Sequence, residues 1–94
     1  MQTQDSQAVV RRFFAALDAV VKEEKNDLRG RATFCRKYEI NRRNLYQLER
    51  DPSRDIFQAA WLTYLVRDYG VSAQWLLTGE GPMMKKHPGR PKNS

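Results

Sequence analysis

The side chains of residues 42–50 that could do chemistry carry guanidinium and carboxamide groups at helical spacing. They are Arg42, Arg43, Asn44, Gln47 and Arg50. Arginine can form paired hydrogen bonds with the edge of guanine, and asparagine and glutamine can do so with adenine. Leu45 and Leu48 lie among them at i, i+3 spacing and are expected to point inward. This set therefore predicts binding to a nucleic acid by the outer side of a helix.

Two short helices joined by a tight turn are predicted over residues 31–51, and they would hold these groups in place. Phe34, Cys35 and Tyr38 give the first helix a small apolar face. Asn41 is the expected N-cap of the second helix, because its side chain can accept from an unpaired backbone N–H. The second helix would thus begin at the first arginine of the set.

Residues 34–41, FCRKYEIN, resemble the second helix and turn of the phage Cro and repressor family, where the usual pattern is apolar-Ala-x-x-apolar-Gly-Val-Ser. Leu45 and Leu48 match that family's second-helix core, and Glu49 matches the acidic residue after it. Cys35 stands where alanine is usual and Glu39 where glycine is usual. If Glu39 has a positive φ, a residue other than glycine costs about 1 kcal/mol there. The resemblance implies a helix-turn-helix whose second helix enters the major groove of duplex DNA.

The resemblance also implies roles for single residues. Three outward residues near the start of the second helix are expected to contact base edges: Arg43, Asn44 and Gln47. Four others are better placed for phosphates: Arg31, Arg42, Tyr46 and Arg50. Glu49 is expected to pair with a nearby arginine, since phosphates would repel its carboxylate.

A second segment of resemblance lies at residues 70–83, GVSAQWLLTGEGPM, which closely resemble the closing helix of bacterial members of the same family. Ser72 is expected to cap this short helix and Gly79 to end it. Trp75 and Leu76 are expected in the core. The resemblance covers about residues 7–84.

Two longer helices complete the prediction. The first is predicted over residues 6–24, with Ser6 as its N-cap. The second is predicted over residues 55–69, with Ser53 or Asp55 as its N-cap. The first of these helices carries two adjacent apolar stripes, which is more than one packing seam requires. Either both stripes belong to the core, or one meets the same helix of a second chain. A homodimer through the first or the 55–69 helix is expected, because a lone small module seldom makes enough DNA contacts.

Together these elements predict an all-α protein. It would be a compact five-helix bundle, a lambda-repressor-like helix-turn-helix domain over residues 6–84, with a disordered basic tail over residues 85–94. The tail, KKHPGRPKNS, is too polar to fold alone.

Four residues of the tail resemble an AT-hook, a motif that lies in the minor groove of A·T-rich DNA: Gly89, Arg90, Pro91 and Lys92. A narrow A·T minor groove has an enhanced negative potential that attracts arginine. The alternative is a basic tail that serves solubility.

The charge distribution agrees with a nucleic-acid partner. The net charge of the 94-residue chain is +6; residues 29–51 carry +4 and residues 85–94 another +4, whereas the other two segments carry −1 each. Clustered positive charge on a near-neutral scaffold is typical of nucleic-acid binders. No apolar run approaches the length of a membrane span and no secretory signal is recognised, so a cytoplasmic location at the nucleoid is expected.

Catalysis is not expected. His87 is the only histidine, and the single Cys35 is expected to be buried without a base nearby. The sequence shows no metal-ligand spacing, and neither a cofactor nor a small-molecule effector is expected. The leading hypothesis is a DNA-binding transcriptional regulator of bacterial or phage origin. The alternatives are an architectural nucleoid-associated DNA binder and, third, a helical protein–protein adaptor.

Overall fold

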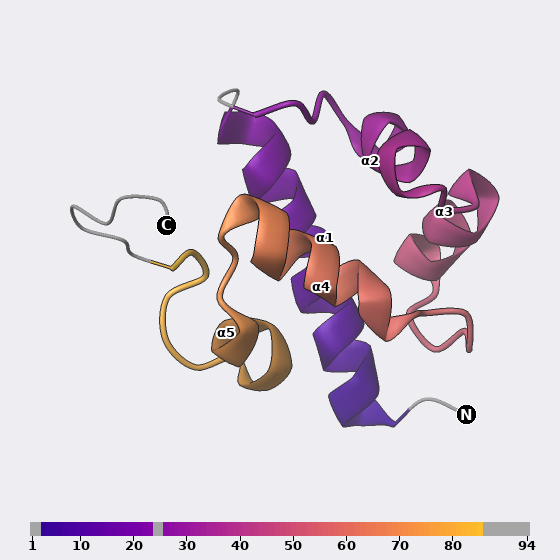
Figure 1. Ribbon diagram of the computed structural model, residues 1–94. Helices are drawn as coiled ribbons and strands as arrows, with labels where there is room; N and C mark the ends of the chain where they lie inside the picture. Colours follow the sequence, from indigo (N-terminus) through magenta and orange to yellow (C-terminus); the bar gives the residue numbers. More distant parts are fainter. Residues whose placement is uncertain (1–2, 24–25, 86–94) are drawn as a thin grey trace.

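The computed structural model describes residues 3–23 and 26–85, which form five α-helices (Figure 1). The helices are α1 (Gln4–Glu23), α2 (Arg31–Tyr38), α3 (Arg42–Arg50), α4 (Ala59–Tyr69) and α5 (Ala73–Thr78). In the described part the only β-type pairing is an isolated antiparallel bridge between Val71 and Met84. The prediction of an all-α five-helix bundle is confirmed. None of the described helices has the length and apolar character needed to cross a membrane.

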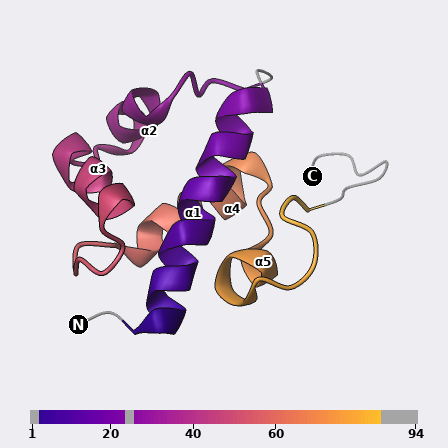
Figure 2. The same cartoon turned by 180° about the vertical axis from the view of Figure 1, so that it is seen from behind.

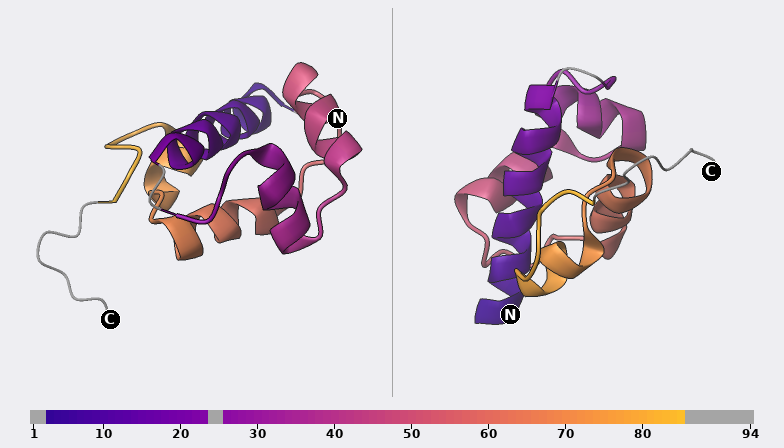
Figure 3. Two further views of the ribbon diagram at one scale, coloured as in Figure 1. Left: turned by 90° about the horizontal axis from the view of Figure 1, so that it is seen from above. Right: turned by 90° about the vertical axis from the view of Figure 1, so that its left-hand side faces the viewer.

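α1 is the central element, and it contacts α3, α4 and α5. α4 crosses one side of α1 in Figure 1, and Figure 2, seen from behind, shows α1 in front of α4. α5 lies beside the N-terminal half of α1. α2 and α3 lie together on the opposite side of the molecule from α5 in Figures 1 and 2 and in the left panel of Figure 3. The α2–α3 pair is therefore displayed at one end of the bundle.

Both apolar stripes of α1 pack inside the chain, which is one of the two predicted alternatives. Six of their residues are buried: Val10, Phe13, Phe14, Ala16, Leu17 and Val20. Val9 and Val21 are half-buried. The Phe13 ring lies edge-on against Phe14 and Phe57 and 5.9 Å from the ring of Phe34 on α2. The wide apolar face is needed because α1 supports three other helices.

α1 begins earlier than predicted. Thr3 Oγ1 accepts from the backbone N–H of Ser6 at 3.1 Å, so Thr3 caps the helix and Ser6 lies inside its first turn. Both residue types cap helices well. The prediction of Ser6 as N-cap is therefore wrong, because a second capping residue stands three positions before it.

α4 begins at Ala59 rather than at residue 55. Ser53 does not cap this helix, because its N–H and hydroxyl both donate to Asp51 Oδ1, at 3.2 and 2.6 Å. Gln58 occupies the N-cap position, without a side-chain cap bond. Before it, Phe57 lies outside the helix and packs its ring at 5.4 Å from Trp61. Tertiary packing thus overrides the helical pattern at residues 55–58.

The C-terminal part of the domain agrees with the sequence. Gly70 ends α4 with φ 75° and Gly79 ends α5 with φ 79°. Ser72 Oγ accepts from the N–H of Trp75 at 3.2 Å and caps α5. Leu76 is buried and Trp75 is half-buried. These local signals were sufficient to place α5.

Candidate nucleic-acid interface

The turn between α2 and α3 is three residues long and contains a left-handed residue. Glu39 has φ 56° and ψ 47°. Its N–H and that of Ile40 both bond to the carbonyl of Cys35, the latter at 2.8 Å, which ends α2. Glu39 therefore has the positive φ that the sequence analysis considered. This conformation costs about 1 kcal/mol of stability for a residue other than glycine.

α3 is built as predicted. Asn41 Oδ1 accepts from the N–H of Asn44 at 3.1 Å and caps the helix. Leu45 and Leu48 are fully buried and fix one side of α3 against the core. Since α3 contacts both α1 and α2, its inner side is held on two helices and its outer side is left to solvent.

The outer side of α3 carries six of the predicted site residues. Arg42, Arg43, Tyr46 and Arg50 are exposed, and Asn44 and Gln47 are half-exposed. Tyr46 is one of two large hydrophobic residues that are exposed in the described part of the chain. None of the six side chains makes a hydrogen bond or ion pair with another described residue. Their donors and acceptors are therefore available to a partner.

Arg31, the seventh predicted site residue, is held inside the protein. Its Nη1 bonds Asp18 of α1 and its Nη2 bonds Glu49 of α3, each at 2.6 Å. The guanidinium lies 5.4 Å from the Phe14 ring centroid, and the side chain is only 17% exposed. Its Nε is buried without a partner among the described residues. Burial opposes the charge of Arg31, but the two carboxylates outweigh that effect and raise its pKa.

This arrangement changes the role of two residues. Arg31 clamps α3 to α1, so it has no free terminal nitrogen for a phosphate in this conformation. Glu49 has the arginine partner that the sequence predicted. Because its charge is compensated by Arg31, the only acidic residue of α3 no longer opposes the arginines beside it.

Arg36 belongs with this surface although the sequence argument omitted it. It is exposed on α2. With Arg42 it lines a hollow of about 370 Å³ that also includes Cys35 and Glu39. Burial raises the pKa of the Cys35 thiol, which keeps it neutral. The sequence did offer a signal for Arg36: it is a basic residue that directly follows the buried Cys35 and lies near the turn.

The N-terminus of α3 is unusually basic for a helix. Arg42 and Arg43 are its first two residues, and its first turn contains no acid. The aligned backbone dipoles give this end a partial positive charge, which favours acids and disfavours arginine. The same end attracts anions, since unpaired backbone N–H groups and the dipole act together. The start of α3 is thus unfavourable for stability but suited to a phosphate-bearing partner.

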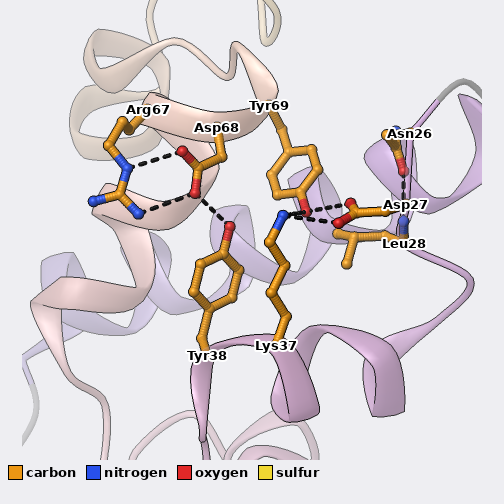
Figure 4. A network of polar contacts seen from close by, with 8 residues as sticks. All are labelled: Asn26, Asp27, Leu28, Lys37, Tyr38, Arg67, Asp68 and Tyr69. Atoms are coloured by element: carbon orange, nitrogen blue, oxygen red, sulfur yellow. Dashed lines mark hydrogen bonds and ion pairs between the residues drawn. The ribbon is translucent and has the colours of Figure 1, made fainter.

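A polar network joins α2 to α4 and to the loop before α2 (Figure 4). Lys37 Nζ bonds Asp27 at 2.8 Å and the Tyr69 hydroxyl at 2.9 Å, and Tyr69 donates to Asp27 at 2.7 Å. In the second half of the network, the Tyr38 hydroxyl donates to Asp68.

Asp68 is the most strongly stabilised carboxylate of this network. It accepts two bonds from Arg67, at 2.8 and 3.0 Å. The bonds from Arg67, and from Tyr38, lower the pKa of Asp68 to about 2 against the opposing effect of partial burial. The rings of Tyr38 and Tyr64 also stack at 4.0 Å. α2 is therefore fixed to α4 by hydrogen bonds and by ring stacking.

The predicted minor-groove residues Gly89, Arg90, Pro91 and Lys92 lie outside the described residues. The last described residue, Lys85, donates its N–H to Gly70 at the end of α4. The start of α4 instead adjoins α3, because Gln58, Trp61 and Asn44 line one hollow of about 250 Å³. The described chain therefore ends about one length of α4 away from the start of α3.

Comparison of the chain with protein-family models, with curated proteins and with solved structures gives no match. The resemblance to the Cro and repressor family stays a prediction from the residues quoted for it. The functional argument below depends on the geometry and charge of the α2–α3 surface.

Proposed function

We propose that this protein binds duplex DNA through the outer side of α3 and acts as a sequence-specific transcriptional regulator at the nucleoid. The observation that carries the proposal is the division of charge around α3. Arg31 and Lys37 are paired with carboxylates of the protein itself. Arg36, Arg42 and Arg43 are exposed and unpaired among the described residues.

The proposed contacts follow from the positions of the side chains. Arg43, Asn44 and Gln47 bear the groups that form paired bonds with guanine or adenine. They share the outer side of a helix whose inner side is buried, which is the arrangement a major-groove helix requires. Asn44 and Gln47 are half-exposed, so a base edge would complete their burial and satisfy their amides together.

Phosphate contacts are proposed for the residues that surround these three: Arg36, Arg42, Tyr46 and Arg50. The guanidinium groups of Arg36, Arg42 and Arg50 would neutralise phosphates and release counterions, so affinity should fall steeply with salt. Each phosphate contact contributes about 0.9 to the slope of log K against log salt. Arg31 supports this surface from behind, as the residue that fixes the orientation of α3 and compensates Glu49.

The experiment that tests the function is selection from a random duplex pool by the full chain, followed by affinity measurements at a stated salt concentration. A specific regulator should bind the selected duplex about 10³–10⁷-fold more tightly than random duplex. A ratio near one, with tight binding to both, would support the architectural alternative instead. No affinity for duplex at low salt would refute both proposals.

A further inference from the structure

Tyr46 on α3 differs from the other three tyrosines of the chain. The rings of Tyr38 and Tyr64 stack on each other at 4.0 Å, and the Tyr69 hydroxyl donates to Asp27 at 2.7 Å. Tyr46 is 43% exposed. In the described part of the chain its ring contacts no other ring or cation, and its hydroxyl has no hydrogen-bond partner. No ring contact or hydrogen bond within the bundle therefore explains the aromatic residue at this position.

The Tyr46 side chain lies between two arginines on the outer side of α3. A helix turns by about 100° per residue, so Tyr46 points about 60° from Arg43 and about 40° from Arg50. It points about 100° away from Leu45 and about 160° away from Leu48, and both leucines are fully buried. Side chains three or four positions apart are neighbours on a helix surface. An exposed ring thus shares the outer ridge of α3 with two exposed guanidinium groups (Figure 1).

The surface of a duplex offers few apolar partners to such a ring. The faces of paired bases are covered by stacking, so aromatic side chains stack on bases mainly in single strands. A contact with a phosphate would need only the hydroxyl and would leave the ring in water. The apolar group on the base edges of the major groove is the C5-methyl of thymine. A pyrimidine C5-methyl group is therefore the partner that the ring fits.

We propose that Tyr46 reads the C5-methyl group of a pyrimidine in the base pair next to the guanine bound by Arg43. This inference rests on the proposed DNA binding and adds a specificity-determining residue to it. Three residues of a helix rise about 4.5 Å, which is close to the spacing of about 3.4 Å between neighbouring base pairs. The ring covers the methyl group, and the hydroxyl at its far end reaches the adjacent phosphate. Both ends of Tyr46 thereby gain the partners that the bundle does not supply.

Two bases carry this methyl group at the same place in the major groove. They are thymine and 5-methylcytosine. Because the ring contacts the methyl group and not the polar edge of the base, the same position should distinguish methylated from unmethylated cytosine. The ligand class is therefore a duplex with a C5-methylated pyrimidine beside guanine.

The test replaces each thymine of the selected duplex by uracil, one base pair at a time. Uracil pairs as thymine does and lacks only the methyl group. Titration of the full chain by fluorescence anisotropy at one salt concentration gives the Kd of each duplex. Uracil at one position should raise the Kd about fourfold, the effect of one buried methyl group. That position should be next to the base pair whose preference Arg43→Ala relaxes.

A second pair of duplexes carries cytosine or 5-methylcytosine at the same position. The methylated duplex should bind about fourfold more tightly, for the same reason. A gain from both methyl groups identifies the methyl group itself as the ligand. A gain with thymine alone identifies thymine as the base that is read.

Two variants, each checked for helical content by circular dichroism, separate the ring from the hydroxyl. Tyr46→Ser keeps a hydroxyl and removes the ring, so it should bind the thymine and uracil duplexes equally. Tyr46→Phe is the matched control, because it keeps the ring and removes the hydroxyl. It should bind both duplexes more weakly than the parent and keep the fourfold ratio between them.

Three results would overturn the inference and leave the DNA-binding proposal intact. The first is a specifically bound duplex in which no thymine lies beside a guanine. The second is specific binding by the parent that no uracil changes. The third is a Tyr46→Ser variant that keeps the parent ratio between the thymine and uracil duplexes. Absence of any specifically bound duplex would instead refute the DNA-binding proposal, and this inference with it.

Discussion

Two arginines occupy the start of α3, where helix stability favours acidic residues. Arg42 and Arg43 are exposed at the positive end of the helix dipole. A surface with no binding role has no reason to bear this cost, because an acid at either position would improve the helix. The conflict between stability and charge is therefore most easily explained by a negatively charged partner.

This conflict predicts that one substitution should raise stability and weaken DNA binding. Arg43→Glu should raise the free energy of unfolding by about 0.3–1 kcal/mol, because it places a favourable charge at the helix N-terminus. It should also abolish binding to the selected duplex. Urea denaturation and fluorescence anisotropy measure the two effects. Lys22→Glu, near the C-terminal end of α1, is the control for a change of two charge units. It should not raise the free energy of unfolding. A loss of stability in Arg43→Glu would show that the arginine has a structural role.

Arg31 illustrates a residue whose role depends on long-range contacts. Its partners Asp18 and Glu49 are 13 and 18 positions away in sequence. Asp18 lies on α1, Arg31 on α2 and Glu49 on α3, so no pattern within one helix could reveal the clamp. Arg31→Met should lower the free energy of unfolding by about 1–3 kcal/mol, since it leaves two carboxylates without their partner over Phe14. Arg36→Met removes an exposed arginine of the same type and should change stability by less than about 0.5 kcal/mol.

At the scale of elements, the turn between α2 and α3 determines how the two helices meet. Glu39 adopts a left-handed conformation that glycine accepts without strain. Glu39→Gly should raise the free energy of unfolding by about 0.5–1 kcal/mol, because the strain relieved exceeds the added freedom of the unfolded chain. Thermal or urea unfolding would measure it. A destabilised Glu39→Gly variant would mean that the Glu39 side chain makes a contribution larger than its backbone strain.

The network between α2 and α4 predicts how stability responds to acid. The pKa of Asp68 is about 2 in the folded protein, below its ordinary value of 3.8. A depressed carboxyl pKa contributes stability that is present above the ordinary value and lost as the pH falls through the folded value. The pKa of Asp27 is also lowered, chiefly by its bond from Lys37. The urea concentration at the unfolding midpoint should therefore decrease as the pH is lowered from about 4 to about 2.

The matching variant is Asp68→Asn, which removes the titrating group and keeps the shape. It should be less stable than the parent at pH 7 and should lose less stability between about pH 4 and pH 2. Equal acid slopes for the parent and Asp68→Asn would show that Asp68 does not contribute to the acid response.

Local chemistry made most of the helices predictable. Asn41 and Ser72 accept from the N–H three residues on, and Gly70 and Gly79 have the positive φ that ends a helix. Each of these signals is contained within a few residues. The start of α4 was mispredicted because Phe57 packs on the core from outside the helix. The network of Tyr38 and Asp68, which are 30 positions apart, had no sequence signal.

At the scale of the whole molecule, the bundle separates two surfaces. α1 supports α3 on one side and α5 on the other. The basic side of α3 is the surface proposed to contact the duplex. The sequence predicts α3 as the DNA-binding helix because its residue types are distinctive.

The tail gives a prediction at this scale. Truncation after Lys85 keeps the bond between Lys85 and Gly70 and removes residues 86–94. These nine residues can span at most about 30 Å. If residues 89–92 enter a minor groove, the truncated chain should lose affinity mainly for duplexes with A·T-rich flanks. Uniform weakening on A·T-rich and G·C-rich flanks would instead indicate a basic tail that attracts any duplex.

The most direct measurement of the central claim is the preference of α3 for particular base pairs. The selected duplex and its single-base-pair variants would be titrated with the parent, with Arg43→Ala and with Asn44→Ala at one salt concentration. Each variant should lose about 1–3 kcal/mol of discrimination at one or two base pairs and keep the parent preference elsewhere. Identical preferences for all three proteins would contradict the account, because the outer side of α3 could not then be the surface that distinguishes the bases.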